Sequence, residues 1–123
     1  AAADITTLNF TTAGMKAVAV NASNPTTGFD AVSGPYNFVV ASGLYTYTIN
    51  HFGDDDQIDM FDGAVVTVNP DTSNVDGEQS INMANSTTGI VTVINLIGLT
   101  NAQDEGLFNT ASIDTVFGPN TLV

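Results

Sequence analysis

Apolar residues alternate with polar residues along most of this 123-residue chain. In "LYTYTIN", residues 44–50, a threonine separates each of Tyr45, Tyr47 and Ile49 from the next. A period of two places such side chains on one face of a strand, whereas a helix needs apolar residues three or four positions apart. The pattern therefore predicts eight short strands, over residues 5–12, 15–21, 36–41, 44–50, 64–69, 79–84, 89–98 and 112–118.

The turns between these segments are rich in Gly, Pro, Asn and Ser. Many short strands separated by such turns are typical of two packed antiparallel sheets. We therefore expect an all-β fold, an antiparallel β-sandwich or jelly roll formed by residues 1–123 as a single domain. Ser42 and Gly43 predict a two-residue hairpin between two of the strands.

One stretch, "LTNAQDEGLFNTAS" at residues 99–112, lacks the two-residue period. Thr100 and Gln103 have the spacing of a capping box, in which each side chain binds the other residue's backbone N–H. This signature predicts one short helix near residues 101–110, with Leu107 and Phe108 on its buried face.

The charge of the chain is strongly one-sided, with 13 acidic residues against Lys16 alone and a formal net charge of −12. A protein of this charge cannot displace counterions from a phosphate backbone, and anionic membrane surfaces repel it. The sequence also contains no apolar run of the ~18 residues that a membrane-spanning helix needs. We therefore expect no nucleic-acid partner and no membrane insertion, and cations are the natural counterpart.

Much of the negative charge lies in "NHFGDDDQIDMFDG", residues 50–63. Oxygen ligands of this kind suit a hard divalent cation, calcium first, and the chain has no cysteine to offer a soft ligand. The alternative is a solvated acidic turn, although three consecutive aspartates repel one another unless water or a cation separates them. The candidate metal ligands are Asp54, Asp55, Asp56, Asp59 and Asp62.

Two stretches carry a resemblance to a known group of proteins, "YTINHFGDDDQIDMFDG" at 47–63 and "VTVINLIGLTNAQDEGLFNTASIDTVFG" at 91–118. They resemble the C-terminal regions of bacterial type I secreted, calcium-associated cell-surface proteins, a group that includes repeats-in-toxin and surface-layer proteins. The chain has no tandem G-G-x-G-x-D nonapeptides. The resemblance implies export without a cleaved N-terminal signal, contact with calcium outside the cell, and a role on the cell surface or in a biofilm matrix.

The residue inventory offers little for catalysis, because His51 is the sole histidine and no Cys or G-x-S-x-G motif is present. We therefore expect a protein that is not an enzyme, and two functions remain open. The first is an extracellular structural subunit that assembles with itself into a filament, surface layer or biofilm fibre. Residues 1–12 would then add a strand to a neighbouring subunit, with Ile5, Leu8 and Phe10 as apolar anchors. The second is a calcium-dependent carbohydrate-binding or adhesin module.

Overall fold

The computed structural model describes residues 15–23, 28–69 and 76–123. The strand expected at residues 5–12 lies outside these ranges. Eight strands and two helices follow in chain order: β1 (Lys16–Val20), β2 (Phe29–Asp30), β3 (Tyr36–Val40), β4 (Thr46–Asn50), β5 (Gln57–Asp59), β6 (Ala64–Val68), β7 (Gln79–Asn85), β8 (Val91–Ile97), α2 (Asn101–Gly106) and α3 (Thr110–Phe117).

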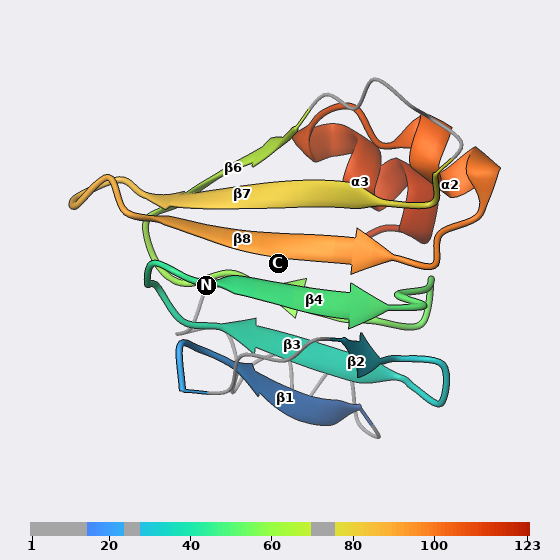
Figure 1. Cartoon of the computed structure of the whole chain (residues 1–123), viewed down its shortest axis with the longest axis horizontal. Helices are drawn as coiled ribbons and strands as arrows, with labels where there is room; N and C mark the ends of the chain where they lie inside the picture. Colours follow the sequence, from blue (N-terminus) through green and yellow to red (C-terminus); the bar gives the residue numbers. More distant parts are fainter. Residues whose placement is uncertain (1–14, 24–27, 70–75) are drawn as a thin grey trace.

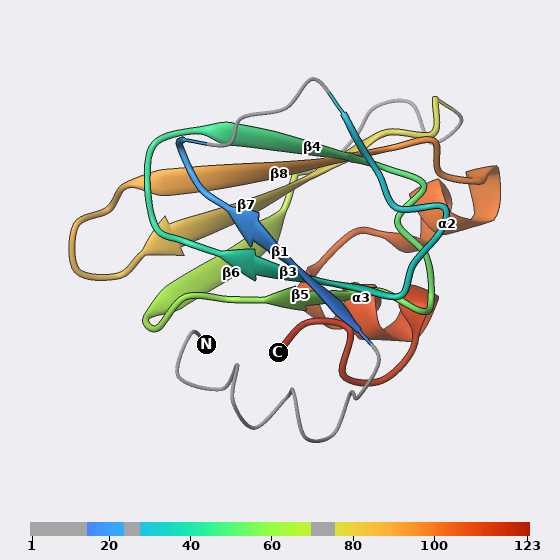
Figure 2. The same ribbon diagram turned by 90° about the horizontal axis from the view of Figure 1, so that it is seen from below.

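The strands form two sheets that face each other, with the helices at one end of the molecule (Figures 1 and 2). The smaller sheet has the strand order β1-β3-β5, and the larger has the order β2-β4-β8-β7-β6. The expectation of a mostly β fold with two sheets is confirmed. The expectation that the sheets are antiparallel is wrong, because only the pairs β6–β7 and β7–β8 run antiparallel.

The first five strands wind between the two sheets, so that β1, β2 and β3 each pair in parallel with the strand two places later in the chain. The paired residues are 20 positions apart in three successive pairings: Lys16 with Tyr36, Phe29 with Ile49, and Asn37 with Gln57. The chain therefore makes a parallel winding of 20 residues per turn. After it, β6, β7 and β8 form an antiparallel meander, and β8 returns to pair in parallel with β4.

The hairpin expected at Ser42–Gly43 is also absent, because β3 and β4 belong to different sheets. The Thr92 hydroxyl holds this turn by donating to the Gly43 carbonyl at 2.6 Å and accepting from the Gly43 N–H at 3.1 Å. Residues 41–45 thus carry the chain from one layer to the other, and the dipeptide does not reverse it within a sheet.

The helical end contains two helices where the sequence predicted one. The predicted capping box is confirmed, since Thr100 accepts from the Gln103 N–H and Gln103 accepts from the Thr100 N–H. Leu107 is buried as expected, but Phe108 is 67% exposed, so its assignment to the buried face is wrong.

Residues 112–118 were expected to form a strand, and they lie in and just after α3. A second capping box, between Asn109 and Ser112, starts this helix. Ile113 and Phe117 are both buried. Their spacing of four positions fits a helix as well as a strand, because four is a multiple of two and about one helical turn. The cap therefore decides between the two periods.

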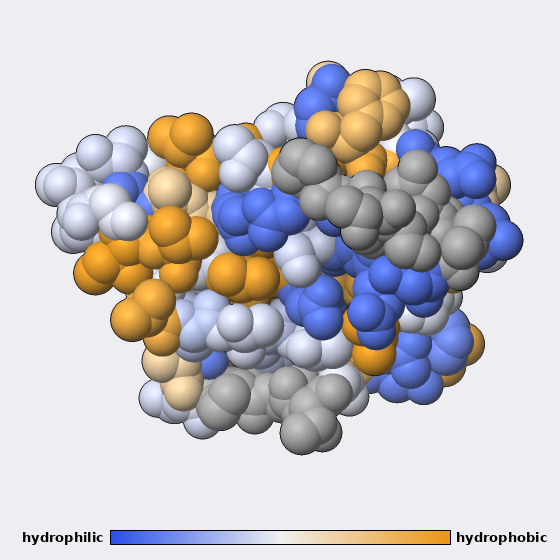
Figure 3. All heavy atoms as spheres, turned by 45° about the horizontal axis from the view of Figure 1, so that its top comes forward, coloured by the Kyte–Doolittle hydropathy of each residue, from blue (hydrophilic) through white to orange (hydrophobic). Residues whose placement is uncertain are grey.

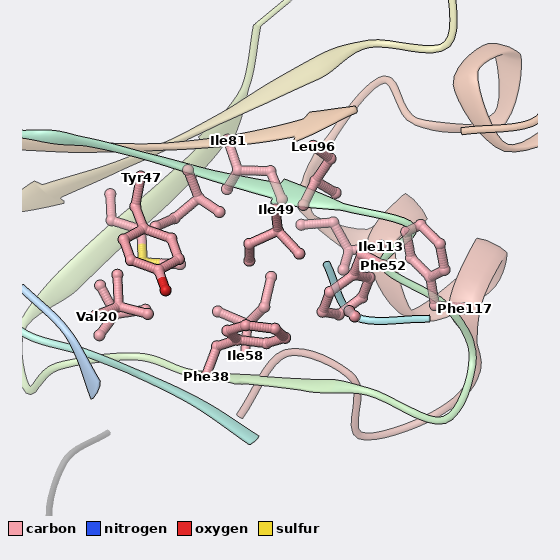
Figure 4. Packing of buried hydrophobic residues seen from close by; sticks show 14 of the residues in the cluster. Val20, Phe38, Tyr47, Ile49, Phe52, Ile58, Ile81, Leu96, Ile113 and Phe117 are labelled. Atoms are coloured by element: carbon pink, nitrogen blue, oxygen red, sulfur yellow. The ribbon is translucent and has the colours of Figure 1, made fainter. Parts of the chain in front are cut away.

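The hydrophobic core lies between the sheets and extends under the helices (Figure 4). Tyr47 and Ile49 of β4 face Phe38 and Ile58 of the smaller sheet, and all four are at most 1% exposed. At the helical end the Phe52 ring packs edge-on against Phe117, with ring centroids 5.0 Å apart. This core fixes the segment that joins β4 to β5, which carries the acidic residues.

Candidate functional site

The acidic stretch begins with a corner of the winding, residues 51–56, which joins β4 to β5. It lies at the end of the larger sheet next to the helices, beyond the arrowhead of β4 in Figure 1. His51 opens the corner with a positive φ of 60°. Because the winding repeats every 20 residues, this corner stacks on the preceding one at residues 31–35.

Asp56 ties the two corners together. One carboxylate oxygen accepts from the Tyr36 N–H at 2.9 Å, and the other accepts from the Gly53 N–H at 2.9 Å. The Asp56 side chain is almost fully buried, at 2% exposed. This burial raises the pKa of Asp56, the two backbone N–H groups oppose the rise, and the charges of Asp55 and Asp54 add to it. The first role of the Asp56 carboxylate is therefore structural, because it links the two corners.

Asp54 and Asp55 are exposed beside it. The Asp55 and Asp56 carboxylates both lie against Gly34 of the preceding corner. A Cβ atom at position 34 would lie 2.5 Å from Asp56 Oδ1 and 3.2 Å from Asp55 Oδ2. Only glycine leaves room for this approach, which gathers two carboxylates at one place between successive turns.

The other two predicted ligands lie further along the chain. Asp59 is fully buried on β5, where it pairs in register with Val39, and Asp62 is exposed in the turn before β6. Within residues 15–23, 28–69 and 76–123, no three acidic, His or Cys side chains converge as a metal site would require. The structure therefore divides the predicted set into a corner trio, a buried strand residue and a turn residue.

The only histidine contacts an aspartate that the sequence analysis did not single out. His51 Nδ1 lies 3.1 Å from Asp30 Oδ1, and the hydrogen bond to His51 is the main cause of the lowered pKa of Asp30. Both side chains are about half exposed. The nearby Ser33 hydroxyl contacts the Tyr36 hydroxyl and not this pair. The contact of His51 with Asp30 thus joins the end of β2 to the next corner, and its geometry is that of a surface hydrogen bond. The two residues are 21 positions apart, close to the winding period, so this contact can be expected only once the winding is known.

A different surface feature lies at the opposite end of the larger sheet, near the β7–β8 hairpin. Figure 3 shows apolar side chains gathered there, while polar side chains dominate toward the helices. The exposed apolar residues of this end include Leu44, Val65 and Ile90. The two ends of the molecule therefore differ in chemistry, one apolar and the other acidic.

The predicted assembly residues Ile5, Leu8 and Phe10 lie outside the described residues. Among the described residues, no helix has the length and apolar character to cross a membrane. Comparison of the sequence with protein-family models, curated proteins and solved structures finds no match.

Proposed function

We propose that this protein is an extracellular structural subunit that assembles with itself into a filament, surface layer or biofilm fibre. The observation that carries the proposal is the parallel winding of β1 to β5. In such architectures each turn is stabilised by its neighbours, and a terminal turn needs a cap or another molecule against it. Self-assembly supplies that neighbour, and export of the type I kind would bring the subunit to the cell surface.

Calcium is the proposed stabilising ion, and the corner trio Asp54, Asp55 and Asp56 is its proposed site. Two of these carboxylates, those of Asp55 and Asp56, already approach each other at Gly34, and the exposed Asp54 would turn toward them to complete the site. The approach of the Asp55 and Asp56 carboxylates at Gly34 supports it, because like charges held together favour a bridging cation. Calcium would neutralise the charges of these carboxylates. Asp56 would keep its hydrogen bonds to the Tyr36 and Gly53 N–H groups and so hold the corner in position. At a net charge of −12, bound cations would also lower the repulsion between subunits.

Assembly is tested on the full chain by sedimentation velocity and negative-stain microscopy, with a chelator and with about 1 mM calcium, the range that suits extracellular calcium modules. We expect polymers in calcium and monomers after deletion of residues 1–12. A full-length chain that stays monomeric in calcium would overturn the proposal, and so would a truncated chain that builds the same polymer.

The metal site is tested separately by calorimetric titration of the chelator-treated protein with calcium. We expect the double variant Asp54→Asn, Asp55→Asn to lose most of the binding. The matched control Asp62→Asn removes one acidic charge outside the corner and should keep it. Equal binding by the double variant and the control would remove the corner from the proposal.

A further inference from the structure

The two sheets have four outer edges, and the structure closes two of them. Residues 121–123 pair with β5, since Ile58 N–H donates to the Thr121 carbonyl at 2.7 Å and Val123 N–H donates to the Ile58 carbonyl at 2.9 Å. On the edge of β6, the Thr110 hydroxyl donates to the Val66 carbonyl at 2.6 Å. A third edge belongs to β2, which has only two residues. The remaining edge belongs to β1.

The backbone of β1 presents hydrogen-bonding groups on this edge. Lys16 N–H donates to the Pro35 carbonyl at 3.1 Å, and the Val20 carbonyl accepts from Ala41 N–H at 2.8 Å. Since alternate residues of a parallel strand bond to the same neighbour, the N–H and C=O groups of Ala17 and Ala19 point away from β3. Both alanines are exposed, and within the described ranges β1 pairs only with β3.

Within the described residues, two features that usually protect an edge strand are missing from β1. β1 contains no proline and no bulge, and its register with β3 is continuous over five residue pairs. The one charged side chain, Lys16, places its ammonium group over the ring of Tyr36, 5.8 Å from the centroid. This charge therefore lies at the first residue of β1 and leaves the outer side of Ala17 and Ala19 uncharged.

We infer that the outer edge of β1 is the acceptor for a second copy of this chain, whose residues 4–10 add as a parallel strand. This inference rests on the proposed self-assembly and names its interface. Every strand pair of the smaller sheet is parallel. In one chain only five residues separate residue 10 from Lys16, and parallel neighbours need a crossover connection of about a dozen residues or more. A second copy has no such restriction.

Charge complementarity sets the register. Lys16 is the only Lys or Arg of the chain, and Asp4 is the only charge in the first ten residues. Pairing Asp4 with Lys16 places Leu8 beside Val20 on the core face. It also places Ile5 beside Ala17 on the other face, where the small alanine leaves room. Leu8 of the added strand thus continues the apolar row formed by Val20 and its partner Val40.

The acceptor edge is tested with proline, which cannot donate a hydrogen bond. The double variant Ala17→Pro, Ala19→Pro removes two outward N–H groups and no N–H that bonds to β3. The matched control, Val66→Pro, removes an outward N–H from the β6 edge. We expect the double variant to lose assembly in calcium, to remain monomeric and to keep its circular dichroism spectrum, and the control to assemble like the parent.

Polymers of unchanged form from the double variant would overturn the inference while leaving self-assembly intact. A parent chain that never assembles would instead overturn the proposed function together with this interface. The two failures are thus distinguishable.

A second measurement does not depend on the proline variants folding. The chain has no cysteine, so Thr7→Cys in one copy and Ala19→Cys in another form disulfides only with each other or with themselves. In the proposed register these positions are direct neighbours. We expect a mixture of the two to give mixed dimers under mild oxidation in calcium, and a mixture of Thr7→Cys with Thr67→Cys of β6 to give few.

The outcome that overturns the inference is an equal yield in both mixtures. A second result would also overturn it: an intrachain disulfide in the double variant Thr7→Cys, Ala19→Cys at high dilution, together with no mixed dimers from the two single variants. That result would mean that the chain closes its own β1 edge.

Discussion

Replacing Asp56 by alanine tests whether the acidic corner holds two turns of the winding together. The Asp56 carboxylate is 2% exposed and accepts from the N–H groups of Tyr36 and Gly53, each at 2.9 Å. A hydrogen bond to a charged group contributes about 1.5–3 kcal/mol, and a buried N–H left without a partner costs about 1–3 kcal/mol. Tyr36 and Gly53 are only half-buried, so water can reach their N–H groups after truncation, and the charge repulsion from Asp55 is relieved. We therefore expect a net loss of about 2 kcal/mol in the free energy of unfolding.

The assay is urea unfolding followed by far-ultraviolet circular dichroism, at neutral pH with a chelator and at a protein concentration low enough to keep the chain monomeric. A lower midpoint with an unchanged slope would report a loss of stability alone. The matched control is Asp54→Ala, since Asp54 is exposed in the same corner and should change stability by less than about 0.5 kcal/mol. Equal stabilities of the two variants would refute the structural role of Asp56.

Two further predictions concern buried polar groups. Because the folded-state pKa of Asp56 is raised, its protonation stabilises the fold. The stability of the parent relative to Asp56→Asn should therefore rise as the pH falls through that pKa, and it should be smallest at neutral pH. Urea unfolding at a series of pH values from about 7 to about 3, the range that brackets carboxylate titration, would contradict this if the difference stayed constant. Asn37 is 2% exposed, and in the part of the chain that the structure describes its side-chain amide has no hydrogen-bond partner, so Asn37→Leu should stabilise the protein by about 1 kcal/mol. The matched change Asn82→Leu, at an amide bonded to Asn69, should not, and thermal unfolding would report either result.

The strands could be predicted from the sequence because burial on one face imposes a period of two, which Tyr47 and Ile49 of β4 show. The direction of pairing could not, because side chains alternate in the same way in parallel and antiparallel strands. The 20-residue winding left no visible repeat either. Its equivalent positions Val18, Phe38 and Ile58 share only their apolar character. Two short strands, β2 and β5, were missed because two or three residues do not establish a period.

The candidate site was predictable as a concentration of charge but not as a geometry. Asp54, Asp55 and Asp56 have the same side chain, and only the stacking of one corner on another makes Asp56 buried and the other two exposed. The contact of His51 with Asp30 depends on the same stacking. Gly34 acquires its role from a close approach across 20 residues or more, which no local pattern reports.

The winding also explains how a chain of net charge −12 could add a copy of itself at β1. Asp56, Tyr36 and Lys16 form a column across successive turns. Asp56 binds the Tyr36 N–H, and Lys16 lies over the Tyr36 ring. In the proposed register Asp4 of the added strand continues this column, so it would meet the only basic side chain of the acceptor. Exposed charges more than ~8 Å apart are largely screened at physiological salt, whereas this contact would be short. The general repulsion between subunits would therefore act most strongly at low salt, and the local attraction between Asp4 and Lys16 would persist where the strands join.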